Sequence, residues 1–182
     1  MPNLPMPEGL GTPDLECVML NIMPLAVLSL LWDGAEKDLF YGTTPELKYA
    51  QGAVGESKAH VTLMFGIHPS PSYHRNVEAV LRGWMPEPIL VSGVSTFPIR
   101  DESQDYYVVK GDVAVTPNLL EARARLEVLN HTDTFPVYHP HVTLAYVKRS
   151  ADIDKWVMVL DKAYAGHEYS PIRLNYGDEE DY

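Results

Sequence analysis

The tetrapeptide His-Val-Thr-Leu occurs twice in this 182-residue chain, beginning at His60 and again at His141. The two copies lie close to half a chain length apart. Each copy opens a segment rich in β-forming residues, and each is followed by a segment with helical periodicity. The same motif in the same context in each half of the chain predicts two similar lobes related by a pseudo-twofold axis.

The spacing within the motif determines which side chains share a face of a sheet. Alternate residues of a strand point to the same side, so His60 and Thr62 emerge together, with their Cα atoms roughly 7 Å apart. His141 and Thr143 do the same on the second strand, while the valine and leucine of each copy point into a core. If the two strands lie near each other, two imidazoles and two hydroxyls line one site.

These groups suit acid–base chemistry at a phosphate. A free imidazole titrates near pH 6.5, so one histidine can take a proton from an attacking oxygen while the other gives one to the leaving oxygen. Threonine hydroxyls can donate hydrogen bonds to the non-bridging phosphate oxygens. A single His-x-Thr on a strand is most often structural, and the second copy is what favours phosphodiester cleavage. Neither step requires a metal or cofactor, and we expect none.

The rest of the pattern favours an α+β fold. Short periodic segments alternate between proline and glycine punctuation, without the glycine pattern of a doubly wound dinucleotide-binding fold. Residues 1–182 are expected to form one domain, with 1–16 a loose N-terminal arm and 177–182 an acidic tail. We expect strands at 17–22, 59–67, 89–97, 106–115, 141–148 and 172–176, and helices from Pro24, at 73–84, 118–129 and 153–163.

The charge balance limits the class of ligand. Acidic side chains outnumber basic ones, 25 against 14, which gives a formal net charge of -11. A protein that coats long duplexes needs the opposite balance, so we expect no long duplex nucleic acid as a partner. A small anion held by a few local donors remains compatible with this charge.

The cysteine content, the N-terminal residues and the apolar segments indicate the cellular compartment of the protein. Cys17 is the only cysteine, so no internal disulfide can form. The N-terminal residues are prolines and acids where a secretory signal would carry positive charge and then an apolar run. The longest apolar stretch, 17–32, is interrupted by polar residues and a proline and is short for a membrane span. We therefore expect a cytoplasmic protein without a membrane partner.

The stretches AHVTLMFG (59–66) and YHPHVTLAYVK (138–148) resemble the 2H phosphoesterase superfamily, whose signature is two His-hydrophobic-Ser/Thr-hydrophobic motifs. They look most like its phage branch, which includes viral anti-CBASS phosphodiesterases that destroy cyclic nucleotide alarm signals. The resemblance implies a bilobal fold, with two antiparallel-sheet lobes around a central metal-independent site and helices outside. It also implies that His60 and His141 are the acid–base pair and that Thr62 and Thr143 bind the phosphate. A phage-encoded member would act in the host cell cytoplasm.

Two tyrosines are candidate substrate contacts. Tyr138, three residues before the second motif, can stack on a base or bond a phosphate, or it can be a half-buried loop aromatic. Tyr169 would suit a nucleobase if residues 168–171 close over the site as a lid, although a strand at a sheet edge fits that segment better. The histidines outside the two motifs have no partner at metal-ligand spacing and read as ordinary polar residues: His68, His74, His131, His139 and His167.

Three functions are compatible with these residues. The first is a metal-independent phosphodiesterase that cleaves 3′-5′ bonds in small cyclic mono- or oligonucleotide signals, as an anti-CBASS enzyme does. The alternative is an RNA-processing enzyme that acts on 2′,3′-cyclic phosphates or on 2′,5′-linked oligonucleotides. The third is a protein that sequesters a nucleotide without cleaving it, which would have no need of two histidines arranged for proton transfer.

Overall fold

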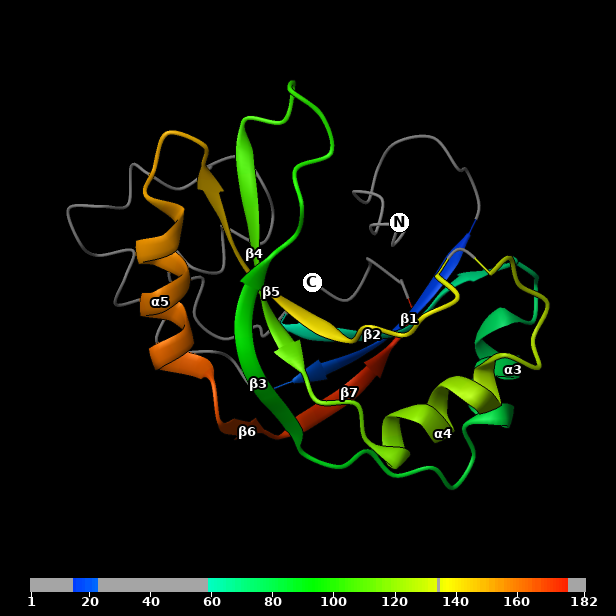
Figure 1. Ribbon diagram of the computed structural model, residues 1–182. Helices are drawn as coiled ribbons and strands as arrows, with labels where there is room; N and C mark the ends of the chain where they lie inside the picture. The colour runs from blue at the N-terminus through cyan, green and yellow to red at the C-terminus, as the bar shows by residue number, and fades with distance from the viewer. Residues whose placement is uncertain (1–14, 23–58, 134, 177–182) are drawn as a thin grey trace.

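The computed structural model describes residues 15–22, 59–133 and 135–176 (Figure 1). The expected helix from Pro24, most of the N-terminal arm and the acidic tail lie outside these residues. In chain order the elements are β1 (Glu16–Ile22), β2 (His60–Ile67), α3 (Tyr73–Val80), β3 (Ile89–Thr96), β4 (Tyr106–Val113), α4 (Pro117–Leu126), β5 (His141–Lys148), α5 (Ile153–Tyr164), β6 (His167–Tyr169) and β7 (Pro171–Asn175).

The strands form two antiparallel sheets. The first has the order β2-β1-β7 and the second the order β5-β4-β3-β6. The two strands that begin with the repeated motif, β2 and β5, are therefore edge strands of different sheets, and they lie side by side near the centre of the molecule (Figure 1). Each is followed by a helix, as the repeat predicts. The α+β fold with two antiparallel-sheet lobes is confirmed.

One face of the first sheet is apolar and packs against α3 and α4 (Figure 1). Alternate residues of β1 and β2 supply this face because side chains alternate along a strand. The sheet contributes Val18, Leu20, Ile22, Val61 and Leu63, and the two helices contribute Val77, Leu119, Ala122 and Leu126, all buried. Helix α4 begins where the side chain of Thr116 accepts a hydrogen bond from the backbone N–H of Leu119.

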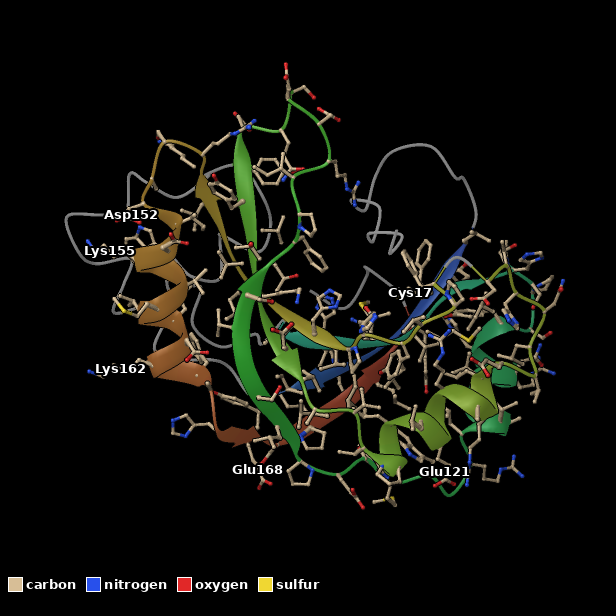
Figure 2. All side chains as sticks on the ribbon, viewed as in Figure 1. Cys17, Glu121, Asp152, Lys155, Lys162 and Glu168 are labelled. Atoms are coloured by element: carbon tan, nitrogen blue, oxygen red, sulfur yellow. The ribbon has the colours of Figure 1, made fainter. Side chains whose placement is uncertain are left out.

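The second sheet packs its apolar face against α5. Trp156, Leu160 and Tyr164 recur along one side of this helix and are buried. A carboxylate oxygen of Asp161 accepts a hydrogen bond of 2.8 Å from the N–H of Val94, which ties the helix to β3. The labelled charged side chains of α5 extend away from the sheet (Figure 2). Val142 and Leu144 of β5 are buried in the apolar core, and side chains alternate along a strand, so His141 and Thr143 lie on the opposite face of the sheet. Among the described residues, no helix has both the length and the apolar composition that crossing a bilayer requires.

Some boundaries differ from those expected. Helix α3 ends at Val80, before the expected Trp84, because the chain turns through Gly83, which has a positive φ of 76°. Trp84 is still buried, so the apolar periodicity continues into the turn and does not mark the end of the helix. The expected strand at a sheet edge is confirmed for residues 168–171, and the segment is not a lid, since Glu168 and Tyr169 pair with β3 in β6 and Pro171 begins β7.

Candidate active site

In the first sheet, strand register shows which residues accompany His60 and Thr62. His60 lies opposite Asn21 of β1, which in turn lies opposite Arg173 of β7. Directly opposite residues of antiparallel strands project from the same face of the sheet. We call the face opposite the apolar one the first polar face. Its polar residues are His60, Thr62, Asn21, Arg173 and Asn175, and Met19 lies between Thr62 and Asn175 on the same face.

The second sheet has a matching polar face. His141 lies opposite Asp112 of β4, and Thr143 lies opposite Lys110, which in turn faces Ser95 of β3. All five side chains are half-buried. We call this set the second polar face.

The two motifs lie together, although they belong to different sheets. Strands β2 and β5 are in contact along their edges. The hydroxyl of Tyr138, just before β5, donates a hydrogen bond of 3.1 Å to the carbonyl oxygen of Thr62 in β2. The charge of His60 is one of the influences that lower the pKa of His141, which puts the two imidazoles within electrostatic range. The structure therefore brings together the four motif residues that the sequence predicts.

The backbone holds the imidazole of His141 in one tautomer. Its Nδ1 lies 3.0 Å from the carbonyl oxygen of His139, two residues earlier. A carbonyl oxygen can only accept, so Nδ1 carries a proton and donates it to this bond. In the neutral ring the lone pair is therefore on Nε2. The ring of Phe97 meets the imidazole edge to face, with centroids 4.9 Å apart and an interplanar angle of 86°, which fixes its orientation.

The surroundings of His141 favour the neutral ring. Burial is the largest cause that lowers its pKa from the ordinary value of 6.5, and the positive charges of Lys110 and His60 lower it further. The bond to the His139 carbonyl and the carboxylate of Asp112 act in the opposite direction. Because the lowering causes prevail, His141 is neutral at neutral pH and can accept a proton.

Lys110 is a cation of the site that sequence reasoning missed. Its ammonium donates a hydrogen bond of 2.7 Å to the hydroxyl of Ser95 and pairs with Asp112. It also lies 5.1 Å from the ring centroid of Phe97, on which the imidazole of His141 packs. Lys110 and Asp112 alternate visibly along their strand, but only the register shows that they oppose the second motif.

The threonine hydroxyls are available to a ligand. Within residues 15–22, 59–133 and 135–176, neither Thr62 nor Thr143 uses its hydroxyl in a hydrogen bond. A hydroxyl beside each imidazole can therefore donate to a bound phosphate oxygen.

The two candidate tyrosines differ in position. Tyr138 is half-buried beside the motifs, with its hydroxyl committed to Thr62 and the guanidinium of Arg123 lying 5.1 Å from its ring centroid. Burial raises its pKa, so it stays a protonated donor. Tyr169 lies in β6, separated from β5 by β4 and β3, and its ring neighbours Tyr164. The structure does not bring Tyr169 to the two motifs.

Two histidines outside the motifs, His68 and His131, form hydrogen bonds with nearby loop residues. His68 is bonded to the hydroxyl of Thr132 at 2.8 Å and to the amide of Asn130 at 3.1 Å, and His131 is bonded to the carbonyl of Leu129 at 2.8 Å. Across the described part of the chain, no three histidine, cysteine or acidic side chains gather in a way that would hold a metal ion.

Comparison with known proteins gives one family match. A family model described as the 2′-5′ RNA ligase superfamily matches residues 43–171, a range that includes both motifs. One solved structure, of Kluyveromyces marxianus Usb1, aligns with a TM-score of 0.46 and 12% sequence identity, covering 85% of this chain and 83% of that one. A comparison with curated protein sequences finds no match.

Proposed function

The chain belongs to the 2′-5′ RNA ligase superfamily, a family of 2H phosphoesterases, and we propose that it cleaves phosphodiester bonds in small cyclic nucleotides with His60 and His141 as its acid–base pair. As a member of this superfamily it is a phosphodiesterase. The observation that carries the proposal is the meeting of two identical His-x-Thr segments from two different sheets. Each imidazole then has a hydroxyl beside it on the same face.

His141 is the general base in this proposal. Its Nδ1–H is engaged by the carbonyl of His139, so Nε2 is the atom that can accept a proton. It takes this proton from the attacking oxygen, which is water or a ribose hydroxyl. A bond forms between that oxygen and phosphorus, and the bond from phosphorus to the leaving oxygen breaks. His60 protonates the leaving oxygen, so every proton is accounted for without a metal.

Three further groups stabilise the charge on the phosphoryl oxygens. The hydroxyls of Thr62 and Thr143 donate hydrogen bonds to the non-bridging oxygens as negative charge grows on them. The ammonium of Lys110, opposite Thr143, adds a positive charge held in place by Ser95 and Asp112. These donors are in position before the reaction, so they need no reorganisation when the charge develops.

The substrate we favour is a cyclic di- or trinucleotide signal, as for a phage anti-CBASS enzyme. A net charge of -11 disfavours a long polyanion that would extend over the surface and favours a compact ligand that is held by local donors. A second candidate is an RNA-processing enzyme that acts on 2′,3′-cyclic phosphates or on 2′,5′-linked oligonucleotides. The description of the matching family model, which names RNA and a 2′-5′ bond, supports the latter substrate.

One assay in EDTA tests the proposal. The protein is incubated with 3′,3′-cyclic dinucleotides, a cyclic trinucleotide, 2′,3′-cyclic AMP and a short 2′,5′-linked oligoadenylate, with His141→Ala as the matched control. Linear products from the cyclic di- or trinucleotides, absent with the variant, support the favoured substrate. Products from only the last two substrates support RNA processing. Tight binding with no product from any substrate would mean that the protein sequesters a nucleotide, and a strict need for added divalent metal would contradict the mechanism.

A further inference from the structure

Arg173 is an exposed cation on the first polar face and takes no part in the proton transfers between His60, His141 and the substrate. It lies opposite Asn21 in the register of β7 and β1, and Asn21 lies opposite His60. Its neighbour Leu174 faces the apolar core opposite Leu20, so Arg173 projects from the other side of the strand, the side of His60. Among the described residues its guanidinium has no hydrogen bond or ion pair.

The strand spacing sets the distance between the backbones of Arg173 and His60. Two strand spacings separate β7 from β2, so the Cα atoms of His60 and Arg173 are about 10 Å apart. Arg173 is therefore too far away to join the proton transfers, but it is near enough to contact the same ligand. Asn21, the residue between them, is polar but only 3% exposed, so it separates the histidine from the arginine without itself facing the ligand.

We propose that Arg173 binds a second phosphate group of the substrate while the scissile phosphate lies between His60 and His141. A guanidinium presents paired N–H donors that match two phosphate oxygens and keeps its charge at any working pH. This inference rests on the proposed function, and it narrows the substrate class to nucleotides with at least two phosphates. Cyclic dinucleotides, cyclic trinucleotides and short linear oligonucleotides belong to that class, and a 2′,3′-cyclic mononucleotide does not.

A different explanation of Arg173 leads to a different result. Strand β7 is an edge strand of its sheet, and charged side chains at edges hinder unwanted pairing with other strands. If Arg173 only hinders such pairing, its replacement would promote self-association of the protein and would leave the affinity for every nucleotide unchanged.

Binding of two product-like ligands, measured by titration calorimetry, separates these explanations. Adenosine 3′-monophosphate and adenosine 3′,5′-bisphosphate differ by one phosphate. We expect the wild-type protein to bind the bisphosphate about tenfold more tightly, which corresponds to about 1.4 kcal/mol. Arg173→Gln abolishes this preference without weakening monophosphate binding, and Arg173→Lys retains part of it. The control Arg82→Gln, with the same charge change beyond the end of α3, keeps the full preference.

Several results would overturn the inference. The first two are a wild-type protein that does not prefer the bisphosphate to the monophosphate, and a preference that survives Arg173→Gln. The others are an equal loss of affinity for both ligands in Arg173→Gln, and no measurable binding of the bisphosphate to the wild-type protein. The EDTA assay reports separately on the proposed function. Turnover without a bisphosphate preference would reject only the role of Arg173, and the preference without turnover would reject only the catalytic proposal.

Discussion

The hydroxyl group of Tyr138 donates a hydrogen bond of 3.1 Å to the carbonyl oxygen of Thr62, which joins the segment before the second motif to the first motif. The two motifs belong to different sheets, so no strand pairing aligns them with each other. This bond is a specific contact that helps to fix the position of β2 relative to β5.

Tyr138→Phe removes this bond and keeps the ring. We expect the free energy of unfolding in urea to fall by about 1 kcal/mol, because the Thr62 carbonyl loses its partner. The rate constant kcat falls with it, since the two histidines are held less well, and KM is unchanged. An increase in KM with unchanged stability would indicate instead that the tyrosine hydroxyl contacts the nucleotide.

Loss of either motif histidine removes one proton transfer. We expect His60→Ala and His141→Ala each to reduce kcat by at least about 100-fold while circular dichroism shows an intact fold. His167→Ala, on the short edge strand β6, is the control and keeps the wild-type rate. Full activity in either motif variant would show that the assignment of the pair is wrong.

The threonine hydroxyls bind the charge that develops on the phosphate. Thr62→Val and Thr143→Val keep the shape of the side chain and remove the donor, so we expect each to lower kcat by roughly 10- to 1,000-fold. Thr132→Val, which alters only the bond to His68, serves as the control in the same assay. Unchanged kcat in both motif variants would remove the threonines from the mechanism.

The pH dependence of kcat/KM tests the role of His141 as the base. Its pKa is lowered chiefly by burial, and a base must be deprotonated to act, so the acidic limb of the profile lies below the ordinary histidine value of about 6.5. Lys110 lowers this pKa and Asp112 raises it. Lys110→Met therefore moves the acidic limb to higher pH, and Asp112→Asn moves it to lower pH. If these two variants move the alkaline limb instead, His141 is the acid.

The sequence predicts the composition of each motif but only part of the site around it. Alternation along a strand is enough to put His60 beside Thr62, and His141 beside Thr143. The partners from other strands depend on register, and the pairing of β4 with β5 is irregular between Val109 and Lys110. Counting residues along one strand therefore cannot show that Lys110 faces Thr143.

Sequence patterns also fail to predict where helix α3 ends and which residues from distant parts of the chain become neighbours. The apolar spacing that predicts a helix to Trp84 continues after α3 ends, because a turn through Gly83 can bury the same side chains. Arg173 and His60 are far apart in the chain, and only the order β2-β1-β7 makes them neighbours on one face. Such neighbours follow from the topology of the sheets, which local residue patterns do not encode.

The most direct test of the central claim is a double-mutant cycle on the two histidines, with one substrate that the protein turns over in EDTA. Because the acid and the base act in the same displacement, the losses from His60→Ala and His141→Ala are strongly non-additive. We predict that the double variant is scarcely slower than the slower single variant. Losses that multiply in the double variant, or a single variant with the full rate, would contradict an acid–base pair formed by His60 and His141.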